Sequence, residues 1–192
     1  MTVCFTGHRT INGQYYDREN YTEHWLAVWQ STVSIVHRLW QQGHKDFISG
    51  GALGFDQLAA NAVLYIKNHQ VDINLWMALP FPGFERKWPA KSQTALVTIV
   101  GQADHMFYID PQSDYKPWKM QKRNKWMVDN SQYVVGLYLD DKTGGTLNCL
   151  KYVMSKYRPF MTLHPLTRII TKYEWDAVNK QYTQAVSQGG VL

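Results

Sequence analysis

Apolar residues follow two patterns along this chain, and the two patterns alternate. Short apolar runs, which predict β-strands, are separated by longer stretches in which apolar residues recur every three or four positions, as on one face of a helix. Six runs fit strands, over residues 2–5, 46–49, 73–79, 105–109, 133–139 and 160–163. Strands that alternate with helices in this way are typical of a parallel sheet.

The stretches between these runs carry helix signals. The first helix is expected between an N-cap at Thr22 and a stop at Gly43. Further helices are expected after residues 54, 117 and 146, and one over about 84–100 with a kink or break at Pro89. We therefore predict a single Rossmann-like α/β domain over residues 1–164, doubly wound, with a mainly parallel sheet and helices on both faces. Residues 165–192 form an extension that fits a helix and a strand pair equally, so it stays unassigned.

Composition narrows the class of protein. With 192 residues, 45% hydrophobic and 18% charged, the chain suits one ordered globular domain rather than a disordered segment. Its apolar runs are too short to cross a bilayer, and residues 1–5 resemble a strand rather than a secretion signal, so we expect a cytoplasmic protein. Cys4 and Cys149 lack metal-ligand spacing, so we expect free thiols, no metal and no cofactor. The net charge of +5 favours an anionic partner.

Two polar loops follow predicted strands, where an open parallel sheet binds its ligands. Thr6-Gly7-His8-Arg9 follows the first strand, and its glycine and arginine suit close approach to a phosphate, although a plain turn has the same composition. The stretch from Ser49 through Gly50, Gly51 and Gly54 joins the second strand to a helix, and its backbone N–H groups suit an anion at the helix start. Its spacing is neither the Rossmann dinucleotide fingerprint nor a Walker loop.

A third loop, with Gly144, Gly145 and Thr146, opens the helix after the fifth strand. Because this loop and the Ser49–Gly54 loop are both glycine loops that follow a strand and open a helix, they favour one shared pocket. Arg123 precedes the fifth strand and is expected to bind ligand as well. Asp56 and Asp129 are the candidate catalytic carboxylates, although an aspartate in the first turn of a helix, such as Asp56, is commonly only a partner of the helix dipole.

These motifs, in this order, resemble the SLOG superfamily, the Rossmann-like group that includes the DNA-processing Smf/DprA proteins and the LOG phosphoribohydrolases, and more narrowly its YpsA-type branch. The resemblance spans about residues 1–164 and implies a nucleotide-derived ligand in the pocket formed by the loops. Relatives with this fold often self-associate, so a homo-oligomer is a further hypothesis. In LOG-type enzymes an arginine before strand five and two glutamates after a Gly-Thr turn cleave an N-glycosidic bond; Arg123 matches that arginine.

The chain departs from the LOG pattern at the glutamates, because Asn148 and Cys149 stand in their place. Cleavage through an oxocarbenium-like transition state calls for a carboxylate near the anomeric carbon. Three hypotheses therefore remain open. The first is a sensor or regulatory domain that binds a nucleotide-like ligand without turnover. The second is a nucleotide hydrolase that uses Asp56 or Asp129, and the third is a protein that binds single-stranded DNA.

Overall fold

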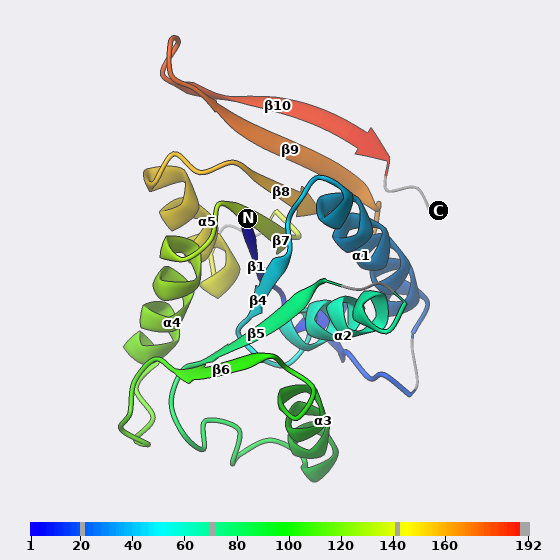
Figure 1. Ribbon diagram of the computed structural model, residues 1–192, viewed down its shortest axis with the longest axis vertical. Helices are drawn as coiled ribbons and strands as arrows, with labels where there is room; N and C mark the ends of the chain where they lie inside the picture. The colour runs from blue at the N-terminus through cyan, green and yellow to red at the C-terminus, as the bar shows by residue number, and fades with distance from the viewer. Residues whose placement is uncertain (20–21, 70–71, 141–142, 189–192) are drawn as a thin grey trace.

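A computed structural model describes residues 1–19, 22–69, 72–140 and 143–188 and confirms the α/β prediction. Its main sheet has eight strands in the described part of the chain, in the order β10-β9-β8-β7-β1-β4-β5-β6 (Figure 1). The six predicted strands form a parallel block within it, made of β1 (Thr2–Gly7), β4 (Asp46–Ser49), β5 (Asn74–Leu79), β6 (His105–Tyr108), β7 (Tyr133–Leu137) and β8 (Phe160–Leu163).

The strand order reverses beside β1. From β1 the chain adds β4, β5 and β6 in turn on one side, and it then returns to place β7 against the other side of β1 and β8 beyond it. The segments that leave β1 and β7 therefore diverge at the carboxyl edge of the sheet. In open α/β sheets this reversal is where a crevice forms.

Helices cover both faces of the sheet (Figure 1). One face carries α1 (Glu23–Gln41), α2 (Phe55–Lys67) and α3 (Ala90–Val100), and the other carries α4 (Pro117–Asp129) and α5 (Gly145–Ser155). The hydroxyl of Thr22 accepts a hydrogen bond from the backbone N–H of Trp25 at 3.4 Å, so the predicted N-cap of the first helix is confirmed. No helix in the described ranges is long and apolar enough to cross a membrane.

Two local features differ from the sequence prediction. The helix expected from residue 84 begins only at Ala90, because Pro89 serves as its N-cap and residues 82–87 form turns instead. A small hairpin of β2 (Thr10–Ile11) and β3 (Gln14–Tyr15) lies in the segment expected to be a loop. Asn12 and Gly13 both have positive φ at its turn, and an Asn-Gly pair is a strong hairpin signal that the sequence reasoning missed.

The unassigned extension is a strand pair over its described residues. β9 (Ile169–Asp176) and β10 (Gln181–Gln188) form an antiparallel hairpin, and β9 pairs antiparallel with β8, so the hairpin lengthens the sheet. Its aromatic side chains hold it in place: the rings of Phe160 and Tyr173 stack with centroids 4.3 Å apart, and Tyr182 packs edge-on against Phe160. Contacts with β8 decide the strand structure that the local pattern left open.

The core lies on both sides of the parallel block, where the strands are shielded by helices on each face. Cys4 and Cys149 are both buried free thiols. Burial raises the pKa of the Cys4 thiol far above its ordinary range and that of Cys149 to about 11, so both stay protonated at neutral pH. Neither is suited to be a nucleophile.

Candidate functional site

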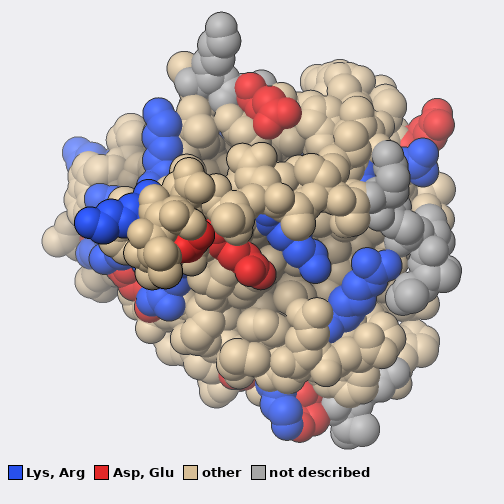
Figure 2. Space-filling model, turned by 90° about the horizontal axis from the view of Figure 1, so that it is seen from above, with Lys and Arg blue, Asp and Glu red and all other residues tan. Residues whose placement is uncertain are grey.

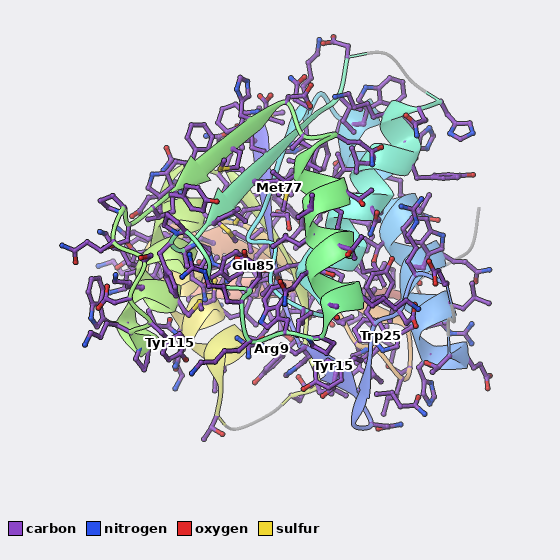
Figure 3. The ribbon with its side chains drawn as sticks, turned by 90° about the horizontal axis from the view of Figure 1, so that it is seen from below. Arg9, Tyr15, Trp25, Met77, Glu85 and Tyr115 are labelled. Atoms are coloured by element: carbon purple, nitrogen blue, oxygen red, sulfur yellow. The ribbon has the colours of Figure 1, made fainter. Side chains whose placement is uncertain are left out.

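A cavity of about 320 Å³ opens at the carboxyl edge of the sheet, where the strand order reverses. It is bounded by the loop after β1, the first turn of α2, the start of α4 and the first turn of α5. Figure 3 labels Arg9 and Tyr115, which both line it. The full lining is Thr6, Gly7, His8, Arg9, Ala52, Asp56, Tyr115, Pro117, Met120, Gln121, Arg123, Asn124, Gly145 and Thr146.

The loop after β1 is fixed by contacts to two neighbouring segments. His8 Nε2 accepts a hydrogen bond from the backbone N–H of Leu139 at 3.0 Å, and the His8 carbonyl accepts one from the backbone N–H of Phe55 at 3.1 Å. The second contact satisfies an amide at the start of α2, one of the groups that we expected to face an anion. Arg9 follows this anchored turn and is exposed at the cavity.

A buried ion pair forms one wall of the cavity. Arg123 Nη1 on α4 donates to Asp56 Oδ2 on α2 at 3.1 Å, and each side chain is less than 10% exposed. The backbone N–H of Ala52 donates to the same carboxylate oxygen at 3.3 Å. Burial raises the pKa of Asp56 above its ordinary value, whereas the nearby charge of Arg123 lowers it. The carboxylate is thus held by two donors, and its ionised form depends on Arg123.

The ion pair leaves one buried donor unsatisfied. Arg123 Nε is fully shielded by protein and has no hydrogen-bond partner among the described residues. Buried polar groups nearly always have partners, and each exception calls for an explanation such as a bound water or ion. Because this nitrogen is shielded, a molecule in the cavity does not reach it in this structure, and the ion pair keeps one unsatisfied donor.

The first turn of α5 is open on the cavity side. Its N-cap, Gly144, has φ +119° and makes no side-chain capping hydrogen bond, and a Cβ at Gly144 or Gly145 would meet no described atom within 4 Å. Thr146 is buried in the cavity lining. Among the residues that the structure describes, none caps this helix start as His8 caps α2, and free N–H groups at a helix start suit an anion.

The structure brings together only part of the predicted site. Eight predicted residues line the cavity: Thr6, Gly7, His8, Arg9, Asp56, Arg123, Gly145 and Thr146. Ser49, Gly50, Gly51 and Gly54 lie behind it as support. The Ser49 hydroxyl donates to the Asp56 carbonyl at 2.7 Å, and a Cβ at Gly50 would lie 1.2 Å from Arg123 Nη1. The missing side chain at Gly50 makes room for the arginine.

Asp129 lies outside the cavity, at the end of α4. Its carboxylate accepts hydrogen bonds from the Tyr152 hydroxyl at 3.0 Å and pairs with Lys156 at 3.4 Å. Six lining residues were not among the predicted site residues, namely Ala52, Tyr115, Pro117, Met120, Gln121 and Asn124. Positions 117, 120, 121 and 124 have the spacing of one helix face, a signal that points to this wall of α4.

The charged groups of the lining are Arg9, Arg123 and Asp56, an excess of positive charge. Such a cavity suits an anion held by guanidinium and backbone donors.

The residues described here include no group of three or more metal-ligating side chains. On the face that carries β9 and β10, Figure 2 shows Lys and Arg mixed with Asp and Glu among the described residues, rather than one field of a single sign.

Comparisons with known proteins agree with this architecture. The sequence model of the family described as the YspA SLOG family matches residues 3–169. The "Uncharacterized SPbeta prophage-derived protein YoqJ" of Bacillus subtilis (strain 168) is 34% identical over 153 residues, which cover 73% of this chain and 89% of that protein. A "UPF0398 protein" of Lactiplantibacillus plantarum is 24% identical over 135 residues, or 70% of this chain and 69% of that protein.

A solved structure shares the fold. It is described as DNA processing protein A from Helicobacter pylori, with a unique single-stranded DNA binding mode, and it superposes with a TM-score of 0.58. The match covers 85% of this chain but only 65% of the other, at 19% sequence identity. This chain therefore spans less than two thirds of that protein, and the likeness is one of fold.

Proposed function

The chain belongs to the SLOG family, in its YpsA branch, and from that premise we propose that its cavity binds a phosphate-bearing nucleotide or nucleotide-derived ligand. The proposed role is that of a sensor or regulatory domain, which holds the ligand without turning it over. The cavity lies at the reversal of strand order, the usual ligand position in an open α/β sheet.

One observation carries the proposal: the first turn of α5, which no described side chain caps, and the guanidinium-bearing residues Arg9 and Arg123 line the same cavity. Backbone N–H groups at a helix start and arginine side chains are the donors that bind phosphate. A volume of about 320 Å³ fits a compact ligand such as a mononucleotide.

The state of the carboxylates supports binding without turnover. Asp56 is the carboxylate of the lining, and its Oδ2 accepts hydrogen bonds from Arg123 and from the Ala52 amide, so this oxygen is committed to structure. Asp129 is outside the cavity and Asn148 is exposed. A hydrolase of this fold would need a free carboxylate at the anomeric carbon.

Replacing Arg9 with alanine tests the proposal. Native protein is titrated with AMP, NMN, ADP-ribose and inorganic phosphate by calorimetry, and each mixture is then analysed for products. We expect binding to weaken about 10- to 100-fold in Arg9→Ala, because a hydrogen bond between charged groups contributes about 1.5–3 kcal/mol. We expect the ligand to be recovered intact.

Arg38→Ala is the matched control, since Arg38 is exposed in the last turn of α1, away from the cavity. Equal affinity in Arg9→Ala and Arg38→Ala would contradict the proposed site. Steady product formation would support the proposed site but contradict the sensor role, and the protein would then be a hydrolase.

A second candidate, single-stranded DNA binding, is favoured by aromatic residues at and beside the same cavity. Tyr115, in the loop before α4, lines the cavity, and Trp118 follows the lining residue Pro117 in α4. Both rings are exposed, and Lys122 Nζ lies 5.7 Å from the Trp118 ring centroid. Proteins that bind single-stranded DNA stack bases on exposed aromatic rings and hold the phosphates in a positively charged groove nearby. The Helicobacter protein, described by its binding of single-stranded DNA, supplies a precedent for the fold.

This candidate predicts that Trp118→Ala weakens binding of a fluorescent oligothymidine by about 1–3 kcal/mol, the contribution of one base stacked on an aromatic ring. Binding followed by anisotropy should also fall steeply as salt rises, because phosphate contacts release counterions. Tyr65→Ala on α2 removes another exposed ring and should leave binding unchanged. If Trp118→Ala binds as well as the parent protein, the DNA candidate is wrong.

A further inference from the structure

A second, larger cavity lies beside the β2–β3 hairpin, which contributes Tyr15 to its lining. Its volume is about 670 Å³, and three segments surround it: residues 15–19, one face of α2 and the first turns of α3. Thr10 pairs with Tyr15 in the hairpin, so Arg9 of the first cavity and Tyr15 of the second lie close together, as Figure 3 shows. The second cavity shares no lining residue with the first.

The floor of this cavity consists of two side-chain amides. Gln57 and Asn61 lie one turn apart on α2 and are only 4% and 5% exposed. The side-chain nitrogen of Asn61 donates to the backbone carbonyl of Gln57 at 3.0 Å and to the Tyr16 hydroxyl at 3.4 Å. The side-chain oxygen of Asn61 accepts a hydrogen bond from Arg18 Nη1 at 3.3 Å. Asn61 is therefore fixed and fully used.

Gln57 is less fully used. Its nitrogen donates to the Gly51 carbonyl at 3.4 Å, but its oxygen accepts no hydrogen bond from any residue that the structure describes. A side-chain amide has two donors and an oxygen acceptor, and a buried one normally fills them. The floor thus presents an acceptor with unused capacity to whatever occupies the cavity.

The charged groups around this cavity cancel one another. Lys91 on α3 pairs with Asp17 at 2.9 Å and with Glu19 at 3.0 Å, and Arg18 is bonded to Asn61. Two positive and two negative side chains line it, whereas arginine exceeds aspartate in the first cavity. A phosphate would find no excess of positive charge here, so the cavity suits an uncharged group.

Aromatic rings complete its wall. Tyr16 packs edge-on against the buried Trp25 with ring centroids 5.6 Å apart, and Trp25 Nε1 donates to the Gln14 carbonyl at 2.9 Å. These contacts anchor the hairpin and leave the neighbouring Tyr15 ring 60% exposed at the rim. An anchored segment with an exposed ring offers a stacking surface at low entropic cost.

We propose that this cavity is a second binding site, which takes an uncharged planar ring with hydrogen-bonding edges, of the nucleobase class. The ring stacks against the tyrosine wall and donates an N–H to the Gln57 oxygen at the floor. Side-chain amides are the groups that pair with base edges, and aromatic rings are the groups on which bases stack. The inference rests on this cavity's own residues and stands whether or not the first cavity binds phosphate.

Ala95→Trp and Val97→Trp on α3 test it as a matched pair. Ala95 lines the cavity, so a tryptophan there fills it, whereas Val97 is exposed and outside the lining. The probe is adenosine at millimolar concentration, followed through the side-chain amide NMR signals of Gln57 and Asn61. We expect adenosine to shift these signals in the parent, in Val97→Trp and in Arg9→Ala, and to leave them unshifted in Ala95→Trp.

A second variant checks the role of the acceptor. Gln57→Met keeps the length of the side chain and removes its oxygen, so we expect adenosine to bind about three- to tenfold more weakly. The inference is overturned if adenosine, guanosine, cytidine and uridine all fail to shift the amide signals of the parent. It is overturned equally if the shifts vanish in Arg9→Ala but persist in Ala95→Trp, because the nucleoside then lies in the first cavity.

The ring has two sources that the same variants distinguish. If it belongs to the molecule whose phosphate fills the first cavity, both Arg9→Ala and Ala95→Trp weaken binding of AMP. If it is a separate molecule, adenosine and inorganic phosphate bind without affecting each other. If the parent protein binds phosphate but not adenosine, only this inference is contradicted. If the parent protein binds adenosine but not phosphate, only the proposed function is contradicted.

Discussion

Replacing Arg123 with methionine is expected to lower the free energy of unfolding by about 3–5 kcal/mol at neutral pH. The change keeps most of the buried volume but leaves the Asp56 carboxylate, which is buried, without its positive partner. Urea unfolding of the parent and the variant measures the difference. Lys122→Met is the matched control on the same helix. Lys122 is half-exposed, and its partner Asp110 keeps a second contact to Lys119, so this loss should be at most about 1 kcal/mol.

The loss in Arg123→Met should depend on pH in a defined direction. Burial raises the pKa of Asp56 in the folded protein, and removing Arg123 removes the charge that opposes this rise. The folded state then keeps a proton that the unfolded chain releases. Stability therefore falls as pH rises from the ordinary pKa of an aspartate to the raised one. The deficit of the variant relative to the parent should be small in acid and largest at neutral pH.

The double variant Arg123→Met/Asp56→Asn separates lost charge pairing from lost packing. Because the neutral amide needs no positive partner, most of the stability should return, and the remaining deficit should not change with pH. A deficit in Arg123→Met that is equal at all pH values would show that packing, not the ion pair, is what the arginine contributes.

Replacing Gly54 with alanine is expected to destabilise the protein and the cavity together. Gly54 has φ +87°, and an added Cβ would lie 2.5 Å from both Cα and the carbonyl oxygen of Arg9. A non-glycine residue in left-handed backbone costs about 1–2 kcal/mol, and overpacking adds about 1–3 kcal/mol. Since the obstacle is backbone, the loop after β1 must move away from α2, and affinity for the AMP probe should fall with stability.

Gly145→Ala is the matched control for the change in stability. Gly145 lies in the first turn of α5, and an added Cβ there meets no described atom within 4 Å. Its unfolding temperature should stay the same or rise, because alanine favours the helix more than glycine does. Thermal unfolding of both variants makes the comparison. Equal unfolding temperatures for Gly54→Ala and Gly145→Ala would mean that the close approach of the backbone at Gly54 does not affect stability.

Much of the fold follows from local signals. The β4 and β8 ranges match their apolar runs residue for residue, and Thr22 caps α1 as its side chain predicts. Pro89 ends a turn region instead of kinking a helix because proline lacks the N–H that a helix interior requires. Such features depend on near neighbours in the chain, so the sequence is enough to find them.

The cavity was predicted only in outline. Three loops and Arg123, in the right order, led to the carboxyl edge of the sheet, and eight of the predicted residues line one cavity there. The wall formed by Tyr115 and Gln121 was not predicted. Tyr115 lies in a loop with no periodicity, and the helical spacing that includes Gln121 was not used. Nor did the sequence reveal the second cavity, whose three segments meet only when α2, α3 and the hairpin pack together.

By itself the sequence determined the alternation of strands and helices, the α/β class and the glycine loops at the strand ends. Tertiary structure decided what those glycines do. Gly50 makes room for Arg123 and Gly54 for the backbone of His8 and Arg9, whereas a Cβ at Gly144 or Gly145 would meet no described atom within 4 Å. The physical reason is that a missing Cβ only creates space, and what fills that space is set by residues distant in the chain. Arg123 and Asp56, 67 positions apart, meet only after the sheet has formed.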